Sequence, residues 1–451
     1  MKKLSTKKAL LASVLSMVLC MTMLIGSTFA WFTDTATVGV NTIQAGELKV
    51  QLVAADSDTE LTAPLSFRDV NGNTNIYWEP GTTFRTEGFR IRSDGNLALK
   101  YKIVLNGVTG DAQLLEAIQF SIVKADGTAV EISDFEGHLA ANTTSSDVLY
   151  LQGTMSKDAG NDYKGLILDG ISITVMATQD TVEQDSNGNT YDENAQYPVA
   201  VDSQVAIDEA IENTAIGEKT TLALPAGTFN LTNGKAKDKN ITIMGNKDTV
   251  IDVCQNLDGE SGANSGMNYQ DGATIFFEGV TILGQTSGNY GGIVRATTIY
   301  KDCTIKGKLT LYGDTTFINC KFENENDYSI WTWGAKNVTF DTCTFETGGK
   351  AILLYGGAGN ENTHTTVMTV NNCVFNDSNN GAKGKAAIET GNDYGATYTL
   401  TVNNTTVNGF IARTSEDGRP NLIPTNSTLW ANKDGMDTAH LSVTINGTKV
   451  Y

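Results

Sequence analysis

The sequence predicts an all-β protein, an antiparallel β-sandwich followed by a solenoid of short strands. One observation is the alternation of apolar and polar residues at period two up to about residue 180, as at Leu48, Val50 and Leu52. Another is a degenerate unit in the second half, in which a polar residue precedes a cysteine. The third is a content of 45 Gly against 6 Pro, which suits many tight turns.

Composition limits the classes of function. The 451 residues carry 32 Lys and Arg against 51 Asp and Glu, a formal net charge of −19. This acidic balance argues against nucleic acid and anionic membrane surfaces as partners. Only 3 His are present, too few for a His-rich metal site or a His-based catalytic triad. The length predicts two or three domains.

Residues 1–30 are predicted to be a signal peptide. Four lysines precede an apolar run over residues 9–25, and the small residues Thr28 and Ala30 mark a cleavage site between Ala30 and Trp31. The alternative is a membrane anchor, but the run is at the short limit for a transmembrane helix. We therefore expect a secreted protein that meets a signal peptidase during export. Without residues 1–30 the charge is 28 − 51 = −23.

The first mature domain is predicted over residues 31–180. Alternating strands are expected at 89–92, 101–105 and 171–175, with turns at Asp94-Gly95 and Asp126-Gly127. A short helix is expected over 112–118. The pattern predicts an antiparallel sandwich. Its single histidine, His138, is expected to be exposed in a loop, and no catalytic constellation is found.

Four segments in this order resemble the TasA/camelysin family of Gram-positive bacteria. They are 30–35 (AWFTDT), 41–50 (NTIQAGELKV), 78–81 (WEPG) and 89–101 (FRIRSDGNLALKY). The resemblance covers about residues 1–180. It implies a SipW-type signal peptidase, a jelly-roll-like sandwich and membership of a family that builds extracellular matrix fibres. The expected location is therefore the extracellular matrix or the cell surface.

The new N-terminus would expose two large aromatics, Trp31 and Phe32, which is costly in water. In one interpretation they pack on their own sandwich. In the other, the segment adds as a strand to a neighbouring subunit. The first domain is accordingly expected to associate with itself or with other matrix proteins.

An acidic linker is predicted over residues 181–198. Asp185, Asn187 and Asn189 resemble the start of a calcium loop, but Thr190 and Gln196 stand where that loop needs Gly and Glu. A solvated connector is favoured, and a weak calcium site remains the alternative. No other cofactor is expected.

The second domain is predicted over residues 199–451. It begins with an amphipathic helix at 201–216 and a strand ending in Pro225-Ala226-Gly227-Thr228-Phe229. The repeat then places Cys303, Cys320, Cys343, Cys373 and Thr405 in one interior slot, each after a polar residue suited to a tight corner. A second interior row is expected from Ile305, Phe322, Phe345, Phe375 and Val407. The short capping helix followed by this strand resembles the entry into right-handed parallel β-helices of the pectate-lyase-like class.

The cysteines in this slot allow two interpretations. Removal of Cys20 with the signal peptide leaves five, an odd number that cannot pair completely. Because four of them occupy equivalent interior positions, a buried reduced row is favoured over disulfides.

Parallel β-helices of this class include lyases, glycosidases and adhesins. If the protein is an enzyme, the catalytic candidates are Asp327, Glu389 and Asp393, and a sugar could stack on Trp331, Trp333 or Tyr394. No paired-Asp segment of the pectin hydrolases is found. The favoured hypothesis is a non-catalytic matrix or cell-surface protein whose first domain anchors it or forms fibres. Its β-helix would display an elongated surface that binds carbohydrate, including polysaccharide, or another cell surface. The alternative is a secreted polysaccharide lyase or glycoside hydrolase.

Overall fold

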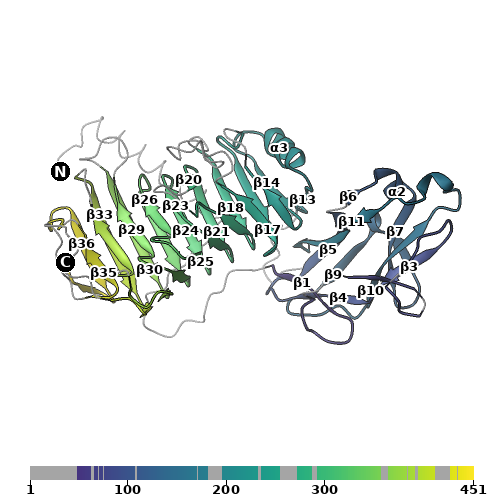
Figure 1. The fold of residues 1–451 in the computed structure, drawn as a ribbon, viewed down its shortest axis with the longest axis horizontal. Coiled ribbons are helices and arrows are strands. Elements are labelled where there is room, and N and C mark those ends of the chain that lie inside the picture. Colours follow the sequence, from purple (N-terminus) through teal and green to yellow (C-terminus); the bar gives the residue numbers. More distant parts are fainter. Residues whose placement is uncertain are drawn as a thin grey trace, which may run out of the picture.

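The computed structural model describes residues 48–451 except 62–64, 70, 75, 107–108, 170, 181–195, 232–234, 254–271, 287–291, 357–363, 383, 392–394, 412–426 and 434. The predicted signal peptide with its Ala30–Trp31 cleavage site and the calcium candidates Asp185, Asn187 and Asn189 lie outside these ranges. Where the chain is described it is nearly all β, as predicted (Figure 1). In this part of the chain no helix is long and apolar enough to cross a membrane.

The N-terminal part is an antiparallel sandwich, as predicted. One sheet contains β1 (Val50–Ala54), β4 (Phe89–Ser93), β10 (Leu149–Met155), β3 (Thr83–Thr86), β2 (Phe67–Arg68), β7 (Ile118–Lys124) and β8 (Ala129–Glu131). The other contains β12 (Ser172–Gln179), β5 (Leu99–Asn106) and β9 (Glu136–Leu139). A small pair, β6 (Thr109–Gly110) with β11 (Leu168–Asp169), the helix α2 (Ala112–Glu116) and two 3₁₀ turns, η1 (Ile132–Asp134) and η2 (Asn161–Tyr163), complete it.

Buried and partly exposed side chains alternate along the strands of this domain, as the sequence predicts. In β4, Phe89 and Ile91 are buried while Arg90 and Arg92 are only partly so. The loop position expected for His138 is wrong, because this residue lies in β9 opposite Lys100 of β5. Its ring nitrogen Nδ1 is 2.8 Å from Asp180 Oδ2, and Asp180 directly follows the last residue of β12. The histidine therefore ties two strands together at the point where the linker begins.

The C-terminal part is a parallel β-helix with three sheets (Figure 1). The first sheet contains β13 (Val199–Ala200), β14 (Lys219–Ala223), β16 (Asn240–Met244), β18 (Thr274–Glu278), β21 (Thr297–Lys301), β24 (Thr315–Ile318), β27 (Asn337–Asp341), β30 (Thr365–Asn371), β33 (Thr397–Asn403), β36 (Leu441–Ile445) and β37 (Thr448–Lys449). The second contains β15 (Gly227–Phe229), β17 (Thr249–Asp252), β19 (Thr281–Leu283), β22 (Thr304–Lys306), β25 (Lys321–Asn324), β28 (Thr344–Thr347), β31 (Val374–Asp377) and β34 (Thr406–Asn408). The third contains β20 (Gly292–Val294), β23 (Leu309–Leu311), β26 (Ile330–Thr332), β29 (Ile352–Tyr355), β32 (Ile388–Gly391) and β35 (Trp430–Asn432).

A helix closes the N-terminal end of this solenoid, as predicted, but it is shorter than expected. Helix α3 spans Gln204–Asn213, and its Ser203 cap accepts a hydrogen bond from the Ala206 amide at 3.2 Å. Ile207 and Ile211, four residues apart, face the core, whereas Val205 is 66% exposed. The helix thus covers the open end of the core with two isoleucines from successive turns.

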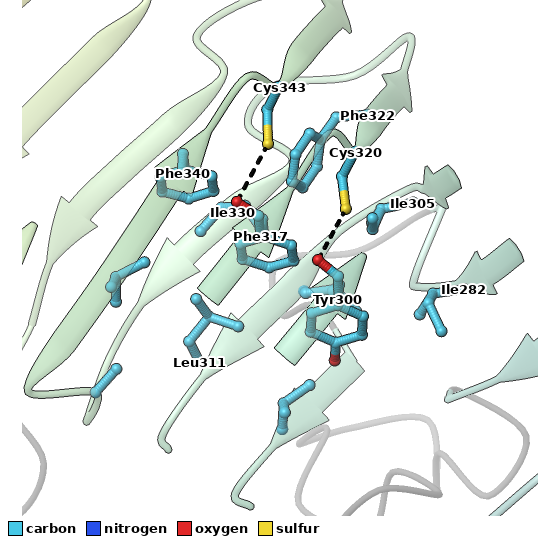
Figure 2. Packing of buried hydrophobic residues seen from close by; sticks show 14 of the residues in the cluster. Ile282, Tyr300, Ile305, Leu311, Phe317, Cys320, Phe322, Ile330, Phe340 and Cys343 are labelled. Atoms are coloured by element: carbon cyan, nitrogen blue, oxygen red, sulfur yellow. Dashed lines mark hydrogen bonds between the residues drawn. The ribbon is translucent and has the colours of Figure 1, made fainter. Parts of the chain in front are cut away.

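The cysteine slot is interior, as predicted. Cys303, Cys320, Cys343 and Cys373 are each at most 2% exposed and carry free thiols. Figure 2 shows the Cys320 thiol donating to the carbonyl oxygen of Tyr300, at 3.3 Å, and that of Cys343 donating to Phe317 at 3.5 Å. Burial raises the pKa of the Cys320 thiol well above its ordinary value, so the thiolate that reacts is scarce.

The corner before each slot has the strained backbone that the sequence suggests. The residues there have φ between 49° and 56°, in the left-handed region that Asn and Asp tolerate best: Asp302, Asn319, Thr342, Asn372 and Asn404. Thr342 is the one residue among these five that is neither Asn nor Asp, and its branched Cβ makes a positive φ costly. Asn319 donates to the Asp302 carboxylate one coil below at 2.5 Å, so these corners also bond to each other.

Two aromatic rows fill the core (Figure 2). The predicted row is present, with Phe345 stacked 4.2 Å from Phe322 and 4.6 Å from Phe375. A second row, not predicted, joins Phe277, Tyr300, Phe317 and Phe340 at centroid distances of 5.0, 4.8 and 5.0 Å. In-register parallel strands place these rings directly above one another.

Candidate functional site

The outer face of the third sheet carries the residues expected to bind a ligand. Each of these strands has three consecutive paired residues. The side chains of the first and third point into the interior of the solenoid, and the side chain of the second points outward. The middle positions form one in-register row: Thr310, Trp331, Leu353, Glu389 and Ala431. Trp331 and Trp333, two residues apart, point to the same side.

The residue that follows Leu311, Thr332 and Leu354, which are paired in register, forms a second outward row. Tyr312, Trp333 and Tyr355 occupy this position in three successive coils, and all three are partly exposed. The guanidinium of Arg295 lies 4.3 Å from the ring centre of Tyr312, and the ammonium of Lys433 lies 4.3 Å from that of Tyr355. We call these five residues the aromatic strip. At about 4.8 Å per coil the strip extends roughly 24 Å along the solenoid.

Trp331 supports the strip from below. Its ring packs edge to face against that of Trp333, at a centroid distance of 5.2 Å. Its indole nitrogen donates a hydrogen bond to the carbonyl oxygen of Tyr355 at 2.9 Å. Because Trp331 is only 9% exposed, it cannot serve as the binding platform that the sequence allowed. Its packing instead holds Trp333 and Tyr355 in place.

A buried charged cluster lies on the same face. The ammonium of Lys350 contacts Asp327 Oδ2 and lies 3.4 Å from Glu389 Oε2. The Lys350 side chain is 6% exposed and that of Glu389 is fully buried, whereas that of Asp327 keeps a third of its surface. The structure thus brings together two of the predicted catalytic candidates. The other, Asp393, and the predicted sugar contact Tyr394 lie outside the described residues.

The electrostatics of Asp327 decide what it can do. Burial acts to raise its pKa, but the charge and hydrogen bonds of Lys350 outweigh burial and hold the pKa below the usual value. Asp327 is therefore a carboxylate at neutral pH and has no proton to give. A glycosidase needs one carboxyl group with a raised pKa as its general acid. Asp327 fits a structural ion pair better than that role.

Sequence analysis missed four members of the strip and Lys350. Tyr312, Trp333 and Tyr355 stand 9, 13 and 12 residues after the cysteine of their own coil, so no fixed spacing marks them. The signal that could have found them is an aromatic residue just after a short apolar strand in each coil.

Residues 5–106 match the family model of the camelysin metallo-endopeptidases. The name of this family implies a metal ion. Within the described ranges no group of three or more His, Cys, Asp and Glu side chains could hold a metal ion. The described residues thus offer no ligand set for a resident metal.

Comparison with curated proteins finds no match. Among solved structures, the Agl-KA catalytic domain is similar at 12% identity and a TM-score of 0.17, covering 91% of this chain and 100% of that chain. The catalytic domain of the GH87 alpha-1,3-glucanase in complex with nigerose is similar at 10% identity and a TM-score of 0.21, covering 88% and 98%. Scores this low carry no argument about the present chain.

Proposed function

We propose that this chain is a secreted bacterial matrix or cell-surface protein that binds polysaccharide along the aromatic strip without cleaving it. The observation that carries the proposal is the row of Tyr312, Trp333 and Tyr355 with a cation at each end. Aromatic rings offer flat apolar area at little cost in side-chain entropy, and their polar edges stay in water. A sugar chain running along the solenoid would place successive rings over successive coils. The match of residues 5–106 to the camelysin model supports export.

The alternative is a secreted polysaccharide lyase or glycoside hydrolase. It is favoured by one observation, the meeting of Asp327 and Glu389 at a single lysine. Both carboxylates would have to exchange protons or attack a sugar carbon. The lowered pKa of Asp327 and the complete burial of Glu389 oppose this. Binding without turnover is therefore the better-supported function.

Replacement of Trp333 and Tyr355 by Ala is expected to weaken polysaccharide binding at least about tenfold, since each ring removed costs on the order of 1 kcal/mol or more of contact. Binding would be measured by affinity electrophoresis and calorimetry across a panel of neutral and acidic polysaccharides. The matched control is Tyr77→Ala, because Tyr77 is a 77% exposed aromatic of the sandwich.

Equal affinity in the double variant and the wild type would contradict the strip as the binding site. Release of reducing ends or unsaturated products by the wild type would contradict the non-catalytic assignment. Each variant is compared with the wild type by thermal unfolding, so that loss of fold is separated from loss of contact.

The proposal extends to the sandwich, which we infer associates with a second copy or with other matrix proteins. Among the described strands, β12 pairs with β5 alone, and it contacts β1 at the edge of the other sheet. On this side Ile173 and Val175 of β12, with Val50 and Leu52 of β1, reach the core but remain partly exposed. An added strand that inserts apolar side chains here would complete the core. The neighbour's residues 31–40, which include Trp31 and Phe32, supply such side chains.

Deletion of residues 31–40 is expected to reduce oligomer size, because it removes the proposed added strand. Light scattering coupled to gel filtration measures the size. A milder variant, Trp31→Ser with Phe32→Ser, keeps the backbone and tests the apolar side chains alone. Unchanged size in the deletion would contradict strand addition.

A further inference from the structure

The outer face of the first sheet carries an uninterrupted row of uncharged residues. From β14 to β36 the strands are parallel and in register, and their central outward positions stack one above another. The row reads Thr221, Thr242, Phe276, Ile299, Thr316, Thr339, Thr369, Thr401 and Thr444. We call the outward residues of these strands the threonine face.

This face is electrically neutral in a strongly acidic protein. The nine strands of the first sheet from β14 to β36 contain two lysines and two acids: Lys219, Lys301, Glu278 and Asp341. Lys301 and Glu278 form an ion pair at 3.0 Å, which leaves one charge of each sign. Two copies of a chain with a net charge of −19 repel each other wherever the acids lie. The threonine face lets two copies approach without that repulsion.

The face also offers contacts that the monomer does not use. Partly exposed threonines provide hydroxyl groups on this face: Thr316, Thr339, Thr369, Thr401 and Thr444. Apolar side chains stand among them: Phe276, Ile299 and Ile318 are partly exposed, and Val367 is 41% exposed. Hydroxyls and apolar groups are thus both available to a partner.

The area of the face suits a weak but specific contact. Nine strands at about 4.8 Å spacing and five residues at about 3.3 Å give roughly 700 Å². Stable complexes bury about 800 Å² on each partner. The comparison predicts an association that is reversible and depends on concentration.

We propose that the threonine face pairs with the same face of a second copy of this chain. The two sheets would pack face to face about a two-fold axis, so that each threonine row lies against its counterpart. This contact is separate from the edge of the sandwich, and a matrix in which both operate would be linked in two directions.

Sedimentation velocity of the chain beginning at Trp31 tests the proposal over about 1–100 μM, the range in which an interface of this size dissociates. The wild type is expected to shift from monomer toward dimer as concentration rises. The double variant Thr339→Lys, Thr401→Lys places like charges opposite each other in the pair and is expected to raise the dissociation constant at least tenfold. The same pair of samples is measured without residues 31–40, which separates this contact from strand addition.

The matched control is Thr344→Lys with Thr406→Lys, because both threonines point outward from the second sheet. It adds the same two charges to the same solenoid and is expected to dimerise like the wild type. Equal dimerisation of the Thr339→Lys, Thr401→Lys variant and the wild type would overturn the proposal. The proposal would also be overturned if the chain without residues 31–40 and with no other change stays monomeric at every concentration. The same conclusion holds if this monomeric chain co-sediments with an insoluble polysaccharide. Thermal unfolding of each variant shows whether the lysines disturb the fold.

Discussion

Replacing Lys350 by Met is expected to lower the free energy of unfolding of the β-helix by about 3–5 kcal/mol, as for the loss of one partner of a buried ion pair. The ammonium is 6% exposed and lies between Asp327 and the fully buried Glu389. Methionine fills a similar volume but removes the ammonium that lies 3.4 Å from the buried carboxylate of Glu389. Urea unfolding followed by tryptophan fluorescence measures the change.

The triple variant Lys350→Met, Asp327→Asn, Glu389→Gln separates charge from packing. Because it removes all three charges together, it is expected to recover most of the lost stability. Lys433→Met is the matched control for a partly exposed lysine of the same face and is expected to cost far less. If Lys350→Met costs no more than Lys433→Met, the buried cluster does not stabilise the solenoid.

The same ion pair gives a dependence on pH. The pKa of Asp327 is lower in the folded protein than in the unfolded chain, so its contribution is complete above the unfolded value of about 4. The contribution is lost as pH falls through the lower, folded pKa. The difference in stability between the wild type and Lys350→Met is therefore expected to shrink in acid below about pH 4.

Replacing Phe340 by Ala is expected to cost about 3–5 kcal/mol, since the ring is fully buried and its loss leaves a cavity. The ring stacks on Phe317 at 5.0 Å and meets Phe345 edge to face at 5.5 Å, so both interior rows lose a neighbour. Chemical denaturation measures the effect. A change below 1 kcal/mol would show that the coils close around the cavity.

Phe276→Ala is the control for Phe340→Ala. Phe276 belongs to the same sheet but faces outward and is partly exposed. Its loss removes apolar area without opening an interior cavity, so we expect a cost of about 1 kcal/mol. Similar losses for both variants would mean that ring stacking in the core adds nothing to burial.

Several features of the fold could be predicted because they depend on local pattern. The alternation in β4 and β5 predicted the sandwich strands, and the repeated cysteine slot predicted one coil per unit. Asn319 and Asn372 predicted the corners, because few residues adopt a positive φ at small cost. The loop expected for His138 was wrong because a short, polar edge strand leaves little apolar alternation to detect.

The candidate site could be predicted only in part. Trp331, Trp333, Asp327 and Glu389 were found by residue type, and the structure places them on one face. Lys350 was missed because a lone lysine in a Gly-rich turn gives no signal until its partners are known. Trp331 is a support rather than a platform, a distinction that depends on its burial and on its contacts with Trp333 and Tyr355.

The sequence by itself determined which residues are interior and where the chain turns, since period and corner residues act within a few positions. Only the tertiary structure decided which coils lie side by side. Lys350 meets Glu389 across 39 residues of chain, and Tyr312, Trp333 and Tyr355 align although the loops before them differ in length. The reason is that strand register, set by hydrogen bonds between coils, places side chains regardless of how much chain each turn contains.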